Sequence, residues 1–290
     1  MQGQAEAPAA GTVLNALANG FGSAFAIDAY TTATVTLTTD GDGYTGEVAE
    51  APDADTTLVE RCVALVVSEF GTDEMTGGHV RTESEVPMAG GLKSSSAAAN
   101  ATVLATLDAL GVPVGAGGAL DRVDACRLGV RAARDAGVTV TGAFDDASAS
   151  MLGGVTVTDN SADELLARDE VDWDVLVYTP DERAFSADAD VSRCERIAPV
   201  ADEVREMALD GRYGRAMTVN GFAFCAALGF PAEPMVEALP DVAGVSLSGT
   251  GPSFTAVGER DVLERVRADW AEREGHTWLT TTQTEGARTT

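Results

Sequence analysis

The clearest helical pattern in the chain covers residues 96–110, SAAANATVLATLDAL. This stretch is rich in helix-forming residues, and its larger apolar side chains recur at helical spacing, at Val103, Leu104, Leu107 and Leu110. Gly111 and Pro113 predict its end, because glycine is favoured just past a helix and proline cannot continue one. The serines before it are candidate N-cap residues: Ser94, Ser95 and Ser96. Further helical patterns cover about 195–210, 212–229 and 261–273.

Extended segments alternate with these helices. Residues 79–87, HVRTESEVP, have extended character and end at Pro87, which cannot continue a central sheet ladder. Residues 155–158, VTVT, and 175–180, VLVYTP, are also strand-like. Residues 244–258, GVSLSGTGPSFTAVG, alternate in the manner of a hairpin whose connection is SGTGPS. The pattern predicts a mixed α and β chain in which a strand, a loop and a helix follow one another before residue 111.

The loop between that strand and that helix reads MAGGLKSSS. Glycines just before a helix let the backbone approach a ligand closely, and the helix N-terminus attracts an anion, typically phosphate. The loop is not a Walker A motif, because Leu92 stands before the lysine where that motif has glycine. It is not a GxGxxG loop either. Many such loops are only helix caps, so the loop by itself leaves both readings open.

Composition indicates a globular protein, with 45% hydrophobic residues and 31 glycines among 290 residues. No apolar stretch approaches the roughly 20 residues of a membrane span. The first residues, MQGQAEAPAAGTV, lack a basic region followed by an apolar core, so we expect no signal peptide and a cytoplasmic protein. The four cysteines are scattered and form no CxxC pair, which favours buried free thiols: Cys62, Cys126, Cys194 and Cys225.

Charge is the most unusual feature of the composition. There are 46 acidic and 19 basic residues, a formal net charge of −27. Such a chain either binds basic proteins or is adapted to molar salt, where the Debye length falls to about 3 Å. The acids are spread along the chain instead of gathered in a tail, which favours the second reading. The same charge argues against nucleic-acid binding.

A single lysine, Lys93, remains among the 19 basic residues. It lies in the glycine- and serine-rich loop, so it is either a stray surface residue or a group retained to neutralise a bound phosphate. Two adjacent acids raise a similar question in residues 138–160, where Asp145 and Asp146 follow a glycine and precede small residues. Adjacent acids in so acidic a chain are usually solvated, whereas crowded small residues indicate a packed or ligand-facing site.

Taken together, these segments resemble the GHMP kinase superfamily, whose second motif has the form P-x-x-x-G-L-x-S-S-(S)-A. Here it runs PMAGGLKSSSAA from Pro87, and the family's glycine-rich third motif resembles SGTGPS at 248–253. Within the superfamily, GLKSSSAAANA, GVTVTGAFDDASAS, LSGTGPSFTAV and the early NALANGFGSAFAID are most similar to the archaeal shikimate kinases. The resemblance covers nearly the whole chain.

The resemblance implies a two-domain α+β fold. A domain like ribosomal protein S5 domain 2 would cover residues 1–160 and carry the phosphate loop. A ferredoxin-like domain would cover residues 161–290 and carry the third motif. The boundary rests on the polar, acidic connection DNSADELLARDEVDWD that precedes the strand-like 175–180.

The implied activity is ATP-dependent phosphorylation of the 3-hydroxyl of shikimate, with Mg²⁺, in aromatic amino acid and chorismate biosynthesis. One alternative is another small-molecule kinase of the superfamily, for homoserine or mevalonate. The other is a non-catalytic metabolite sensor derived from such a kinase. The family's own versions of the motifs argue against the first, and the intact loop and aspartates against the second. The partners expected are ATP and a small-molecule acceptor, and the sequence leaves the oligomeric state open.

The resemblance also assigns roles to individual residues. Lys93 would neutralise phosphate charge, and an aspartate would orient or deprotonate the acceptor hydroxyl. In the superfamily the catalytic aspartate lies shortly before a Gly-Gly pair. Counting back from Gly153 selects Asp146 for that role, whereas counting forward from Gly142 selects Asp145. Residues 87–97 would hold the nucleotide: Pro87, Met88, Ala89, Gly90, Gly91, Leu92, Lys93, Ser94, Ser95, Ser96 and Ala97. Ser95 would also bind Mg²⁺.

The acceptor side is assigned from hydrogen-bonding residues near these motifs. The expected substrate contacts are Asn15, Ser23, Thr139, Thr141, Gly249, Thr250 and Gly251, with Asn19 as a further candidate in the N-terminal loop. A carboxylate on the acceptor needs a cation. Arg131 and Arg134 precede the aspartates and would meet that carboxylate, or would lie on a solvated helix face.

Overall fold

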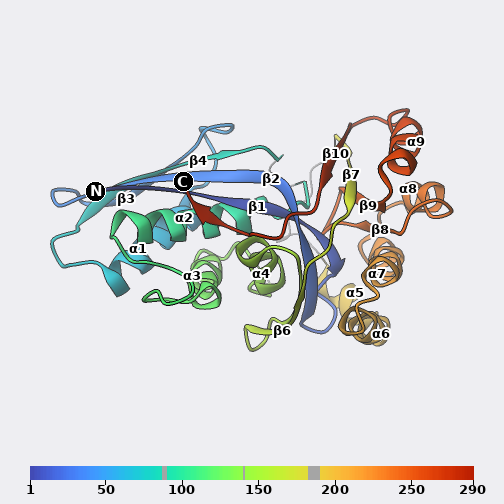
Figure 1. Ribbon diagram of the computed structural model, residues 1–290, viewed down its shortest axis with the longest axis horizontal. Coiled ribbons are helices and arrows are strands. Elements are labelled where there is room, and N and C mark those ends of the chain that lie inside the picture. The colour runs from blue at the N-terminus through green and yellow to red at the C-terminus, as the bar shows by residue number, and fades with distance from the viewer. Residues whose placement is uncertain (87–89, 140, 182–189) are drawn as a thin grey trace.

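The protein is built from two β-sheets, each covered by helices (Figure 1). A computed structural model describes residues 1–86, 90–139, 141–181 and 190–290. Pro87, Met88 and Ala89, predicted to hold the nucleotide, lie outside the described residues.

The first sheet has the strand order β11-β1-β2-β4-β3, with β5 paired to β2 and β6 paired to β5. Its strands are β1 (Gln2–Leu14), β2 (Phe21–Thr38), β3 (Gly43–Val48), β4 (Gly77–Ser84), β5 (Val155–Asp159), β6 (Glu164–Asp169) and β11 (Arg288–Thr289). The helices on one face of this sheet are α1 (Thr57–Phe70), α2 (Ser94–Ala109), α3 (Arg122–Asp135) and α4 (Phe144–Leu152) (Figure 1).

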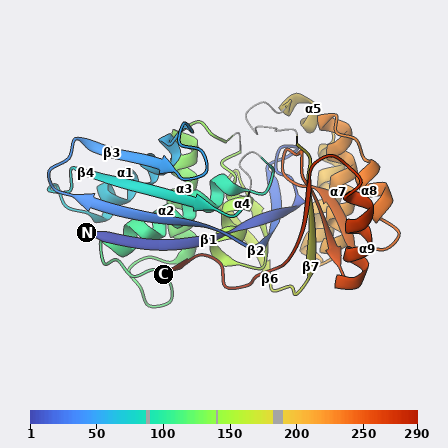
Figure 2. The same cartoon turned by 90° about the horizontal axis from the view of Figure 1, so that it is seen from above.

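The second sheet is antiparallel, with the order β10-β7-β9-β8. Its strands are β7 (Asp174–Thr179), β8 (Gly244–Leu247), β9 (Phe254–Gly258) and β10 (His276–Thr281). Three helices pack against it (Figure 2): α7 (Tyr213–Leu228), α8 (Glu233–Ala238) and α9 (Arg260–Trp270). The short α5 (Val191–Glu195) packs on α7, and α6 (Ala198–Leu209) packs on α7 and on the β1–β2 hairpin. The hairpin predicted over 244–258 is β8–β9.

The long β1–β2 hairpin joins the two halves. The far end of the hairpin, at Leu14 and Phe25, lies in one continuous apolar core with α7 residues such as Met217 and Phe224. Chain topology joins them again, because the last strand, β11, returns to pair with β1 near the N-terminus (Figure 1). The two sheets divide the chain differently from the boundary predicted after residue 160. β6 still pairs within the first sheet, and the second sheet begins at Asp174.

Helix α2 differs from the sequence prediction in two ways. Its first residue is Ser94, and the N-cap is Lys93 rather than a serine, with no side-chain cap bond. The predicted apolar stripe is not its only buried surface, since small polar residues such as Asn100, Thr102 and Thr106 are buried too. Small side chains on every face let β1, α1, α3 and α4 pack around it. Helix α4, which carries both aspartates, and the short α8 were not predicted.

Two expectations about composition can be compared with the structure. All four cysteines are buried free thiols, as predicted. Among the described residues, no helix is both long and apolar enough to span a membrane.

Candidate active site

The loop before α2 is fixed by hydrogen bonds from two distant segments, the β8–β9 turn and strand β1. The carbonyl of Gly91 accepts a hydrogen bond from Ser248 Oγ (2.8 Å), and the carbonyl of Leu92 accepts one from Ala10 N–H (3.2 Å). Gly91 has φ +80°, and a Cβ added there would lie 2.4 Å from the Ser248 carbonyl oxygen. Only glycine allows this approach, which seats the predicted phosphate loop against the β8–β9 turn.

Lys93 stands at the point where α2 begins. Its backbone is left-handed, with φ 64°. The N–H groups of the first helical turn have no partners within the helix and point toward the N-terminal end, where an anion is favoured. The lysine side chain extends to Asp146 on α4, and its Nζ lies 2.8 Å from Asp146 Oδ1. With side chains 9% and 15% exposed, this pair is shielded from solvent and joins the N-terminal ends of two helices.

Asp145 occupies the inner side of the same helical turn. Its residue is 3% exposed, and its Oδ1 accepts a hydrogen bond from Asn160 Nδ2 (2.7 Å). A Cβ added to Gly22 of β2 would lie 2.5 Å from its carboxyl carbon, so the strand packs directly on it. Burial, and then the charge of Asp146, raise the pKa of Asp145 to about 7, while Lys93 and the Asn160 hydrogen bond act in the opposite direction. The two adjacent aspartates therefore have different environments.

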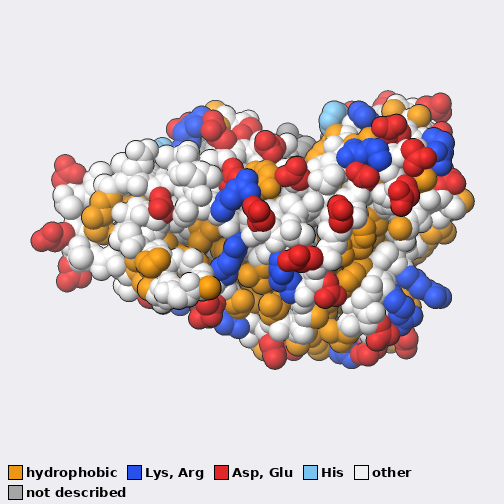
Figure 3. Space-filling view, viewed as in Figure 1, with side chains coloured by type: hydrophobic (Ala, Val, Ile, Leu, Met, Phe, Trp, Pro, Cys, Tyr) orange, Lys and Arg blue, Asp and Glu red, His pale blue; other side chains and the backbone are white. Residues whose placement is uncertain are grey.

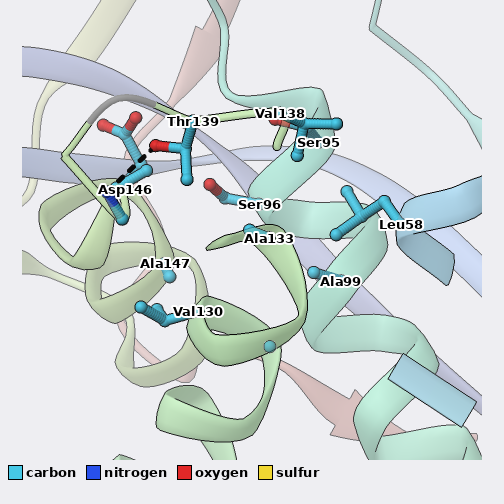
Figure 4. Close-up of a pocket in the computed structure, with 13 residues that line it drawn as sticks. Leu58, Ser95, Ser96, Ala99, Val130, Ala133, Val138, Thr139, Asp146 and Ala147 are labelled. Carbon is cyan, nitrogen blue, oxygen red and sulfur yellow. Dashed lines mark hydrogen bonds between the residues drawn. The ribbon is translucent and has the colours of Figure 1, made fainter. Parts of the chain in front are cut away.

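Two adjoining pockets meet at these charged groups. The first, about 440 Å³ of open space, lies between α1, α2, α3 and α4. Figure 4 shows Asp146, Thr139 and Ser96 gathered at one end and apolar groups at the other, including Leu58 and Ala99.

The second pocket, about 390 Å³, lies between the β1–β2 connection, the α4 N-terminus and the β8–β9 turn. Its lining is mostly polar: Asn15, Ala16, Leu17, Lys93, Thr139, Thr141, Ala143, Asp145, Asp146, Gly249 and Thr250. Three residues line both pockets, namely Thr139, Ala143 and Asp146. Two small molecules held in these pockets would meet beside Asp146 and Lys93.

The chain was compared with known proteins. Residues 57–154 match the family model for the N-terminal domain of GHMP kinases. A curated shikimate kinase of Halobacterium salinarum is 64% identical over 290 residues, which is 100% of both chains. The chain belongs to the archaeal shikimate kinase family of GHMP kinases. A second member, the shikimate kinase of Methanococcoides burtonii, is 51% identical over 269 residues, covering 92% of this chain and 91% of the relative.

Solved structures of other GHMP kinases share the fold of this shikimate kinase family member. A homoserine kinase from Cytophaga hutchinsonii superposes with a TM-score of 0.74 at 17% identity, covering 100% of this chain and 97% of the other. The Methanococcus jannaschii mevalonate kinase gives 0.75 at 14% identity, covering 98% of each. At these identities the likeness concerns the fold, and it confirms the GHMP kinase fold predicted from the motifs.

The structure brings most of the predicted site residues of this family member together. Of the predicted loop, Lys93, Ser95 and Ser96 line the pockets, whereas Leu92 and Ala97 are buried in the core. Five of the predicted substrate residues line the second pocket: Asn15, Thr139, Thr141, Gly249 and Thr250.

Other candidates lie away from the pockets. Ser23 is fully buried within β2, and neither it nor Gly251 lines either pocket. Asn19 donates a hydrogen bond to Asp202 on the surface (2.9 Å). Arg131 pairs with Glu69, and Arg134 pairs with Asp163, so their guanidinium groups are engaged elsewhere.

Several residues that hold the site were not found from the sequence. Asn160 binds Asp145 through its side chain, and Asn220 Oδ1 accepts from the N–H of Asn15 (3.0 Å). Thr12 Oγ1 accepts from the N–H of Gly249 (2.8 Å). A single asparagine or threonine carries no local signal of such a role, because its partner lies far away in the chain.

The residues present fit a Mg²⁺ ion that is held largely by a nucleotide. Among the described residues no group of three or more His, Cys, Asp or Glu side chains could hold a metal by itself. The first pocket nevertheless places the hydroxyl oxygen of Ser95, the residue predicted to bind Mg²⁺, on its lining. Mg²⁺ commonly takes one or two protein oxygens and completes its shell with phosphate oxygens and water.

Proposed function

We propose that this protein transfers the γ-phosphoryl group of ATP to the 3-hydroxyl of shikimate. The observation that carries the proposal is Asp146, which lines both pockets and is paired with Lys93 at 2.8 Å. Phosphoryl transfer requires a donor and an acceptor held in line, with charge stabilisation where they meet. A shielded cation and carboxylate at the junction of two pockets suit that requirement.

The first pocket would hold the nucleotide. The start of α2 offers the N–H groups of its first turn and the hydroxyls of Ser95 and Ser96 to the phosphates. Apolar side chains that line this pocket, such as Leu58, Val130 and Ala133, suit a nucleoside base. When bound, Mg²⁺ would neutralise charge on the transferred group, with the Ser95 hydroxyl as its protein ligand.

The second pocket would hold the acceptor. Shikimate carries three hydroxyls and a carboxylate, and this lining offers hydroxyl, amide and ammonium groups from Thr139, Thr141 and Lys93. Mevalonate would require an apolar surface for its methyl group, which the polar lining supplies less well. This favours a polyhydroxylated acceptor over the mevalonate alternative.

We assign the acceptor-orienting role to Asp146 and not to Asp145. Asp146 lines both pockets, whereas Asp145 lines only the acceptor pocket and is held from behind by Asn160. Phosphoryl transfer depends more on positioning than on deprotonation, and the ion pair with Lys93 holds the Asp146 carboxylate in place. Lys93 would pass part of its charge to the phosphates as they enter.

A coupled ADP assay in molar KCl tests the proposal across shikimate, homoserine, mevalonate and galactose. Shikimate should be preferred by at least about tenfold in kcat/KM, equivalent to about 1.4 kcal/mol of discrimination. Asp146→Asn should lower kcat by roughly 10²–10⁴-fold. The matched control is Asp124→Asn, also in the first turn of a helix and paired with Arg127, but on the surface. A preference for another acceptor, or ATP binding without turnover, would refute the assignment.

A further inference from the structure

Asn160 lies just after β5 and is 2% exposed. Its main chain is held on both sides, because its N–H donates to the Gly20 carbonyl (2.9 Å) and its carbonyl accepts from Arg134 Nη2 (3.2 Å). With the backbone fixed, the side chain points at the first turn of α4, where both aspartates lie.

The hydrogen bonds of Asn160 determine which way its amide faces. The Oδ1 atom accepts from the backbone N–H of Asp145 (3.1 Å) and from Thr158 Oγ1 (2.8 Å). A backbone N–H only donates, so the atom facing it must be the oxygen. The Nδ2 group is therefore the one 2.7 Å from the Asp145 carboxylate.

The same contacts replace a missing helix cap. The N-cap position of α4 is Ala143, which has no side-chain acceptor. An orphan N–H at the start of a helix is normally satisfied by a Ser, Thr, Asp or Asn at that position. Here Asn160 reaches across from β5 to accept from the Asp145 N–H, and in doing so fixes the turn that presents Asp146.

We propose that Asn160 is a positioning residue for phosphoryl transfer, because its amide both caps α4 and fixes the Asp145 carboxylate in the turn that carries Asp146. This inference rests on the proposed function, since it concerns the same site. The charged groups that face Asp145 are Asp146 on its own helix and Lys93 at the start of α2. The strands packed against it contribute uncharged groups in the described residues, Gly22 of β2 and Thr156 of β5. Asn160 is then the neutral donor to Asp145, while the ammonium group of Lys93 pairs with Asp146.

The test uses Asn160→Ala and the isosteric Asn160→Asp, which retains an acceptor oxygen, removes the donor and adds a carboxylate beside Asp145. Both remove a hydrogen bond that favours ionised Asp145. Because the charge of Asp145 acts on Asp146 and Lys93, its ionisation should appear as a limb of the kcat–pH profile. That limb should move to higher pH, by about one unit in Asn160→Ala and further in Asn160→Asp, which adds a negative charge. The KM for ATP should change little, since Asn160 does not line the nucleotide pocket.

Asn100→Ala is the matched control. Asn100 is equally buried and donates to the Ala147 carbonyl of the same helix (2.8 Å), but it is not bonded to either aspartate. It should reduce stability without moving the pH limb.

A second readout separates this inference from the assigned activity. The pH dependence of the melting temperature should change in Asn160→Ala and Asn160→Asp, and this change should vanish when Asp145→Asn is added. A wild-type protein that does not phosphorylate shikimate would refute the proposed function, and the melting data would still test the contact. An active wild type whose Asn160 variants match Asn100→Ala in both pH profiles would overturn the inference.

Discussion

Replacing Gly91 by alanine should separate the phosphate loop from the turn that holds it. Gly91 has φ +80°, and its new Cβ would lie 2.4 Å from the Ser248 carbonyl oxygen and 3.0 Å from that of Gly251. Both obstacles are backbone atoms, so no side chain can rotate away. The loop or the β8–β9 turn must move.

The expected loss of unfolding free energy in Gly91→Ala has two parts. A left-handed alanine costs about 1–2 kcal/mol relative to glycine, and overpacking against a fixed backbone costs typically about 1–3 kcal/mol. Gly111→Ala is the matched control, because Gly111 also has positive φ (+69°) but nothing lies within 4 Å of its added Cβ. Gly111→Ala should therefore lose only the free energy that the left-handed alanine costs. The difference between the two variants therefore isolates the contact with Ser248.

The stability assay is urea unfolding at constant molar KCl, since urea is uncharged and leaves the ionic strength unchanged. Gly91→Ala should lose about 1–3 kcal/mol more than Gly111→Ala. Its kcat/KM for ATP should fall by about 10²-fold, because displacement of a positioning loop by about 1 Å has that order of effect. Equal unfolding free energies and equal kcat/KM in the two variants would refute the reasoning that this contact seats the loop.

Three other predictions concern charge. Lys93→Ala should lower kcat by at least about 10²-fold and destabilise the fold, because it leaves Asp146 without its shielded partner. Lys93→Arg should restore only part of the activity. Unchanged kinetics in Lys93→Ala would contradict this prediction. Asp145→Asn should stabilise the protein above pH 7 by up to about 4 kcal/mol. The pKa of Asp145 is about 7 in the folded protein and 3.8 for a free carboxyl, so its ionisation opposes folding, and asparagine does not ionise. That gain should shrink as the pH falls from 7 to 4 in paired melting curves, and a gain that is constant with pH would show the burial argument to be wrong. Transfer from molar KCl to dilute buffer should unfold or inactivate the protein, because acidic side chains are spread over its surface (Figure 3) and their repulsion is then unscreened; equal melting temperatures in the two buffers would refute it.

The nucleotide side of the site was predictable because its signals are local. Glycines directly before a run of helix formers indicate a loop and a helix N-terminus, and β4 and α2 lie where those patterns predict them. The hairpin β8–β9 was equally evident from its alternation. The N-cap was mistaken, because the serines were judged by propensity while the actual cap, Lys93, takes a left-handed backbone. Its side chain contacts Asp146, on a different helix.

The predicted domain boundary was also judged from local sequence alone. An acidic, polar stretch after residue 160 suggested a linker, yet part of it forms β6 and pairs with β5. The return of β11 to β1 carried no signal either, since two residues of strand have no detectable period. Strand partners depend on which edges remain unpaired once the whole sheet has formed.

The sequence by itself determined the family and singled out the loop before α2, its solitary lysine and the two candidate aspartates. Only the tertiary structure distinguished those aspartates, because successive residues on a helix point about 100° apart. One step along α4 carries a carboxylate from the junction of two pockets, beside Lys93, to a buried position against Gly22 and Asn160. Adjacent residues of identical chemistry differ in burial and in hydrogen-bond partners through what packs around them, and that packing is supplied by strands and loops from both ends of the chain.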